Sequence, residues 1–144
     1  MAAMPSEDLE FVQSLRLFVE GYAGPHERAV RRAPEVFDLF ARLFSSDQLD
    51  RSSRQMVNGV LAYFVAPGDA MPEDTLGPYG LLDDLYVATH AFRTLRRELA
   101  SEVMEEAWRG EGDLDEVLAM VFSESKAAVG KKGREALRLA GLAG

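Results

Sequence analysis

The feature that most constrains the fold of this chain is a loop rich in proline, glycine and acid, residues 67–84, between two apolar helical patterns. An apolar run ends at Ala66, and the longest unbroken helical pattern follows over 83–108. The loop holds five carboxylates and no Lys, Arg or His. This arrangement predicts a helical hairpin whose two arms pack against each other across a sharply turned connection.

Helical periodicity also covers the rest of the chain, and no stretch has the alternating pattern of a strand. Apolar residues recur at helical spacing, and Gly, Pro or the break at Ser45, Ser46 and Asp47 separates the patterns. We expect an all-α fold, a single compact bundle of five or six helices with a central helical hairpin, 50–66 and 83–108, joined by the acidic Pro/Gly loop. The other helices are expected at 6–22, 25–32, 34–44 and 114–128.

One domain suits a chain of 144 residues. We expect residues 1–130 to form a single helical domain, with Gly130 as a helix stop. Residues 131–144 form a basic tail, which is either a weak last helix or disordered.

Composition excludes several classes of function. The net charge is −8, and nucleic-acid binding needs a basic surface. Without cysteine there are no disulfides and no thiol chemistry, and this fits a reducing compartment, so we expect a cytoplasmic protein. The longest near-apolar run, 56–66, is far shorter than the roughly 20 residues of a membrane span, and the N-terminus lacks a signal-peptide pattern.

The acids of the loop allow two interpretations. In the first, they are structural: Asp83 and Asp84 begin a helix, where carboxylates stabilise the free N–H groups and the helix dipole. In the second, Asp69, Glu73, Asp83 and Asp84 bind a divalent cation, Mg²⁺, Ca²⁺ or Mn²⁺, with His90 as an additional ligand two turns into the helix. We favour the structural interpretation, since a lone histidine on an apolar helix is more often a hydrogen-bonded core residue.

No known catalytic pattern accompanies these acids. The loop does not have EF-hand spacing, and the chain has no HExxH, Gly-x-Ser-x-Gly, GxGxxG or Walker pattern. We therefore name no catalytic residue and expect no cofactor other than the divalent cation of the second interpretation. His26 is expected at the surface.

The residues around the loop resemble a known family. Ala62–Glu73 and Leu76–Asp84 give an apolar helix, a Pro-x-Asp-x-x-Pro-Glu turn, and a Gly-x-x-Asp-Asp opening of a second apolar helix. This pattern is similar to the YkvA-like family of small bacterial helical domains of unknown function, over about 56–95. Gly68 departs from the aliphatic residue that is more common there. The resemblance implies a helical hairpin around an acidic loop and implies no activity.

Charges in the second half of the 83–108 pattern are arranged in blocks, with Arg93, Arg96 and Arg97 before four glutamates, Glu98, Glu102, Glu105 and Glu106. One interpretation is a second copy packed antiparallel over a stripe of Leu95, Leu99 and Val103, giving a salt-sensitive dimer. Two other interpretations of these charges are a solvated face and pairing of the glutamates with the basic tail. The basic tail is also compatible with weak peripheral contact with an anionic membrane.

The sequence thus favours a non-enzymatic helical interaction module that binds a protein partner or self-associates. The acidic loop serves as its structural staple or docking surface. The alternative is a divalent-metal-binding protein, such as a hydrolase, that uses the carboxylate cluster of the 67–84 loop.

Overall fold

The computed structural model describes residues 6–66 and 76–142, and all the regular structure in these two ranges is helical. The all-α prediction is confirmed. Five of the described helices have 13 to 17 residues, as expected for the bundle. The elements are α1 (Ser6–Val19), α2 (Glu27–Val30), α3 (Ala33–Ser45), α4 (Arg51–Val65), η1 (Gly77–Leu81), α6 (Leu82–Glu98), α7 (Ser101–Ala107), α8 (Leu114–Val129), η2 (Gly130–Lys132) and α9 (Gly133–Leu139).

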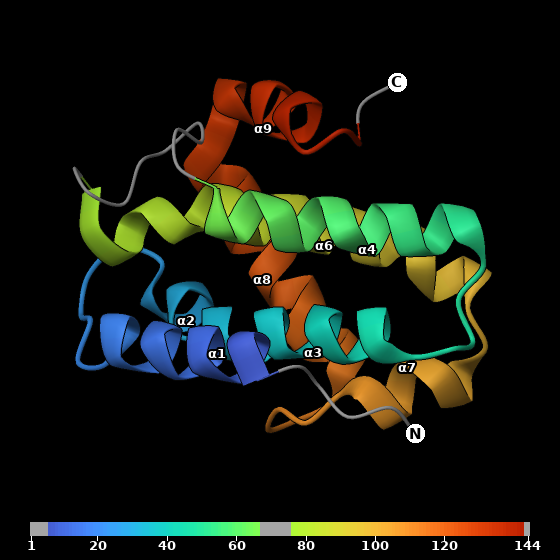
Figure 1. The fold of residues 1–144 in the computed structure, drawn as a ribbon. Coiled ribbons are helices and arrows are strands. Elements are labelled where there is room, and N and C mark those ends of the chain that lie inside the picture. The colour runs from blue at the N-terminus through green and yellow to red at the C-terminus, as the bar shows by residue number, and fades with distance from the viewer. Residues whose placement is uncertain (1–5, 67–75, 143–144) are drawn as a thin grey trace.

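Figure 1 shows the helices in two main layers, α4 with α6 above and α1 with α3 below. The chain enters α4 and returns through α6 in the opposite direction, so the predicted hairpin is present and its arms are in contact. Helix α8 crosses behind the layers and packs mainly on α6, while α9 lies on top. The lower layer contacts the upper one chiefly through α3.

Helix α3 lies at the centre of the core, together with α6. Its sequence is apolar around most of its surface, and Phe37, Leu39, Phe40 and Leu43 are each at most 1% exposed. A helix that is apolar nearly all round must be buried on several sides. Because α1, α4, α6 and α7 all pack on it, α3 positions the helices that form the surface grooves described below.

Two helix starts follow the local rules for capping. The Asp50 carboxylate accepts the Ser53 N–H at 2.7 Å at the start of α4, and Asp113 accepts the Glu116 N–H at 3.1 Å at the start of α8. These side chains satisfy backbone donors that the first helical turn leaves free. The expected stop at Gly130 is also present, with φ of 51°, in the left-handed region that glycine tolerates.

The single helix predicted over 83–108 is wrong: the chain breaks at Leu99 and Ala100, whose backbones are extended, and continues as α7. A straight helix of this length would be about 39 Å long and would leave the domain. The break turns α7 back against α3 and buries Met104 fully. Burying an apolar side chain of this size is worth roughly 1.5–3 kcal/mol, which offsets the helical hydrogen bonds lost at the break.

This break also changes the interpretation of the charge blocks. The glutamates after Glu98 lie on α7, separate from the arginines of α6, and Arg96 pairs with Asp115 of α8 at 3.0 Å. Leu95 is 1% exposed, and Leu99 and Val103 pack against the protein's own core. The stripe is therefore largely covered within the chain, and the antiparallel dimer stays a prediction from the sequence.

The start of the basic tail is a helix, α9, that packs on α6 and approaches α4. Gly133 and Ala136 are buried, and a Cβ placed on Gly59 of α4 would lie 2.6 Å from the Ala140 carbonyl oxygen. Of the two alternatives for the tail, the structure shows the helix over 133–139. In the described part of the chain, no helix is long and apolar enough to cross a membrane.

Candidate functional site

The residues proposed as metal ligands fall into three groups. Asp69 and Glu73 lie outside the described residues. Asp83 and Asp84 lie in the first turn of α6 and are completely buried. His90 lies two turns later on the same helix and is half-buried.

Asp83 is part of a buried polar contact between the two arms of the hairpin. The Tyr63 hydroxyl of α4 donates to Asp83 Oδ2 at 2.8 Å, and the Asp84 N–H donates to Asp83 Oδ1 at 2.8 Å. A buried carboxylate needs such donors because burial removes its hydration. This contact joins α4 to α6 at the base of the acidic loop.

His90 lies in an environment unfavourable to a cation. Burial, and then the nearby Arg93 charge, lower the pKa of His90. Its ring packs beside Tyr86, with centroids 6.1 Å apart. Among residues 6–66 and 76–142, no group of three or more His, Asp or Glu side chains is arranged to hold a metal ion.

Two arginines, Arg54 and Arg31, donate to backbone carbonyl groups. Arg54 donates to the Phe44 and Ser46 carbonyl oxygens at 2.6 and 2.5 Å. Arg31 donates to the Tyr22 carbonyl oxygen at 2.6 Å. These arginines hold turns in place, a role that the sequence pattern did not show.

His26 was expected at the surface, but it is partly buried and joins two distant segments. Its Nδ1 lies 2.8 Å from Glu124 Oε1 of α8, which also has Arg28 within 3.6 Å. The hydrogen bond with His26, followed by the charges of His26 and Arg28, lowers the pKa of Glu124. His26 also has a left-handed backbone, with φ of 60°. Nothing in the local sequence pairs it with a residue 98 positions away.

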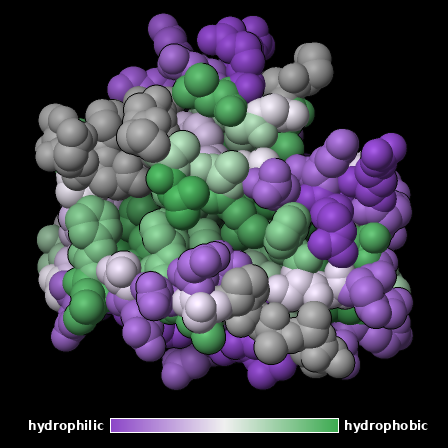
Figure 2. Space-filling model, viewed as in Figure 1, coloured by the Kyte–Doolittle hydropathy of each residue, from purple (hydrophilic) through white to green (hydrophobic). Residues whose placement is uncertain are grey.

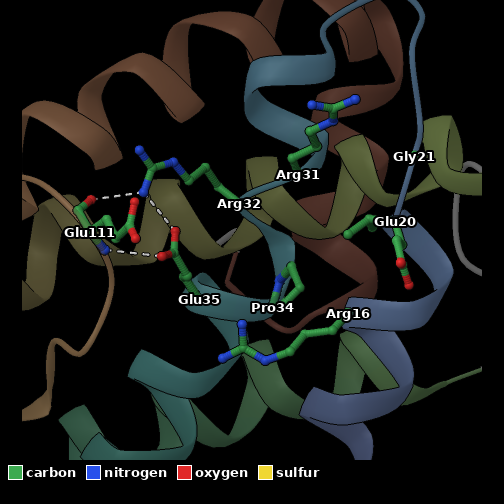
Figure 3. A pocket seen from close by; sticks show the side chains of 9 residues that line it. Arg16, Glu20, Gly21, Arg31, Arg32, Pro34, Glu35 and Glu111 are labelled. Atoms are coloured by element: carbon green, nitrogen blue, oxygen red, sulfur yellow. Dashed lines mark hydrogen bonds and ion pairs between the residues drawn. The ribbon is translucent and has the colours of Figure 1, made fainter.

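A polar cavity of about 680 Å³ opens between α1, the start of α3 and the loop after α7. Figure 3 shows the Arg32 guanidinium between the Glu35 carboxylate and the Glu111 carbonyl group. Arg32 Nη1 lies 2.7 Å from Glu35 Oε1 and 2.8 Å from the Glu111 carbonyl oxygen, and the Glu111 N–H donates to Glu35 Oε2 at 3.0 Å. These bonds fasten the loop to α3. The cavity wall is therefore a structural network, with its lining charges balanced between arginine and glutamate.

A second hollow runs between α1 and α4, and we call it the front groove. Both helices pack on α3, and among the helices that the structure describes they are not a closely packed pair. The space between them forms two adjoining hollows, of about 310 and 370 Å³, which share Val65. The lining residues are Glu7, Asp8, Phe11, Ser14, Leu15, Phe18, Phe37, Phe44, Asn58, Leu61, Ala62, Phe64, Val65, Ala66 and Leu81.

Aromatic rings form the floor of the front groove. The rings of Phe11 and Phe37 are 4.6 Å apart between centroids, and those of Phe37 and Phe64 are 5.4 Å apart with edge-to-face geometry. These three rings come from α1, α3 and α4, so the floor is held by all three helices. At the rim, Phe18 is 40% and Val65 55% exposed.

Figure 2 shows the apolar surface as a band across the middle of this face, between the layer of α4 and the layer of α1. A contiguous apolar band with a polar border is typical of a protein-interaction surface, whereas single exposed apolar residues are ordinary. Among the described residues that line the groove, the polar ones are Glu7, Asp8, Ser14 and Asn58, and none is Lys, Arg or His. Such a surface is suited to binding an apolar partner.

Comparison with known proteins gives two similarities. Residues 54–89, which include the end of the hairpin's first arm and the start of its second, match a family described as a protein of unknown function (DUF1232). The chain is also 34% identical over 130 residues to the uncharacterized protein ORF9 of Methanothermobacter thermautotrophicus, covering 88% of this chain and 89% of the relative. No solved structure matches the chain.

Proposed function

Because this chain belongs to the family of the uncharacterized ORF9 protein, a family of small helical proteins of unknown function, we propose that it is a non-enzymatic interaction module that binds a protein partner in its front groove. The observation that carries this proposal is the separation of α1 from α4 on their shared support, α3. The separation leaves an apolar, aromatic-floored groove on the surface. The acidic loop then acts as a staple at the hairpin, through the Tyr63–Asp83 contact.

The groove supports binding better than catalysis. Its walls are rigid elements, since α1 and α4 are both fixed on the buried helix α3. Burial of exposed apolar surface contributes roughly 25 cal/mol per Å². A partner that covers Phe18 and Val65 would therefore gain binding free energy. Aromatic side chains are also enriched among residues that dominate binding energy.

Two finer assignments are part of this proposal. The YkvA-like assignment is supported by the overlap of its motif, within 56–95, with the matched region 54–89. Self-association is a second form of the interaction role, although the Leu95 stripe is largely covered within the chain. A cytoplasmic location and weak membrane contact of the basic tail stay predictions from the sequence.

The test begins with a photo-reactive residue at Ser14, an exposed position in the groove lining. A cross-linked protein from the source cells would be identified, purified and measured against this chain by calorimetry. We expect Val65→Lys to weaken that binding more than tenfold, because a charge would have to be buried in the apolar contact. Leu139→Lys is the matched control, since Leu139 is 53% exposed on α9, outside the groove lining.

Both variants should melt close to the wild type because both positions are exposed. A purified partner that binds Val65→Lys as tightly as the wild type would show that the front groove is not the binding site. Failure of every cross-linked candidate to bind as a purified protein would also count against the proposal.

A further inference from the structure

We infer that the partner of the front groove is an amphipathic helix of about four turns with a basic side chain at the end that faces Glu7 and Asp8. This inference rests on the proposed function of the groove and adds the chemistry of its occupant. It follows from the shape of the groove, the distribution of charge along it and the hydrogen bonding of its walls.

The shape favours a helix. Figure 1 shows α1 and α4 running in the same direction on either side of the groove. The 14 residues of α1 extend about 21 Å at 1.5 Å per residue, so a partner helix of about 14 residues would match the length of the wall. A helix laid between two others on a common support packs by the same ridges and grooves as the bundle itself.

The walls also disfavour an extended peptide. Extended segments bind by adding hydrogen bonds to an exposed strand edge. In the ranges 6–66 and 76–142 the regular structure is helical, and the groove is flanked by two α-helices whose inner turns bond within each helix. Side-chain packing by an apolar stripe at i, i+3, i+4 and i+7 is the mode that such walls allow.

Charge distinguishes the two ends of the groove. Glu7 and Asp8 line the hollow that contains Asn58, while the hollow that contains Phe18 and Ala66 has no charged residue among its described lining residues. Asp8 is half-buried, and burial followed by repulsion from Glu7 raises the pKa of Asp8.

Among the described residues, Arg54 is bound elsewhere: it stacks over the Phe44 ring of the groove lining at 5.3 Å and donates to two backbone carbonyl groups. A Lys or Arg of the partner would place a positive charge beside Glu7 and Asp8. The overall charge of −8 would also draw a cationic partner towards the chain.

The experiment uses the full chain and a displayed library of 14-residue amphipathic helices in which the polar positions are randomised. Binding is selected on the wild type and counter-selected on Val65→Lys, so that only groove binders remain. We expect the survivors to carry Lys or Arg at one end of the helix. Synthetic copies of the survivors should bind Asp8→Asn about fivefold more weakly than the wild type, with the difference shrinking in high salt.

Glu10→Gln is the matched control, because it removes the same charge from an exposed position of α1 outside the groove lining. It should leave peptide affinity unchanged. Groove binders without any preference for basic residues would overturn this inference while leaving the proposed function intact. A wild-type dimer that Val65→Lys converts to a monomer in sedimentation equilibrium would overturn it too, since the occupant would then be a second copy.

A library without any binder sensitive to Val65→Lys would overturn the helix inference. The proposed function would then be decided separately by the Ser14 cross-link, which requires no assumption about the partner's conformation.

Discussion

Replacing Gly59 with alanine tests how the tail is held on the bundle. Gly59 lies in the interior of α4, where Gly→Ala normally stabilises a helix by about 1 kcal/mol. Here the new Cβ would lie 2.6 Å from the Ala140 carbonyl oxygen, whereas ordinary contact begins near 3.4 Å. The difference, 3.4 − 2.6 = 0.8 Å, must be absorbed by backbone of the segment after α9.

Overpacking of this kind costs about 1–3 kcal/mol. The gain in helix propensity offsets about 1 kcal/mol of this cost. Gly59→Ala should therefore lower the free energy of unfolding by up to about 2 kcal/mol. The assay is urea denaturation combined with amide hydrogen exchange of residues 133–142, whose protection should fall. Asn58→Ala is the control: Asn58 is exposed on the same helix, and its replacement should stabilise the protein by roughly 0.5 kcal/mol.

The reasoning would be refuted if Gly59→Ala stabilised the protein by about 1 kcal/mol while residues 133–142 kept their protection. That result would mean that the tail does not approach α4 closely. Loss of protection without loss of stability would instead show that the tail detaches at little cost.

The remaining predictions concern single contacts. Tyr63→Phe should lower the free energy of unfolding in urea by about 1–3 kcal/mol because the buried Asp83 carboxylate loses a donor, and an unchanged midpoint would contradict this role. Burial and the Arg93 charge lower the pKa of His90 below the usual histidine value of 6.5, so the folded chain binds fewer protons than the unfolded chain. The free energy of unfolding should therefore fall as the pH drops below 6.5. His90→Gln should flatten that part of the pH profile of the urea midpoint. Asp113→Ala should cost about 1 kcal/mol by removing the cap of α8, measured by the same denaturation.

Local patterns in the sequence were enough to predict the all-α class and most helix boundaries. The predicted 50–66 and 114–128 helices correspond to α4 and α8 within a residue at each end. These features depend on residues a few positions apart, where periodicity and capping rules act.

The candidate metal ligands were grouped by their nearness in sequence, whereas those that the structure describes have separate neighbours. Asp83 contacts Tyr63 across the hairpin, while His90 lies beside Tyr86 and Arg93. The front groove was missed because the sequences of α1 and α4, taken one at a time, look like those of ordinary amphipathic helices. Its sequence signal is the apolar face of the first helix, with Phe11, Leu15 and Phe18 at helical spacing.

The sequence by itself determined that the chain is helical, where most of its helices start, and that an acidic loop joins the two arms of the hairpin. Only the tertiary structure decided which apolar faces are buried. It bent the 83–108 pattern at Leu99 so that Met104 could reach the core, and it placed α1 and α4 apart on α3. The physical reason is that an apolar stripe requires a covering surface but does not specify which one. In the front groove the covering is incomplete, and the apolar surface left there is the basis of the proposed interaction.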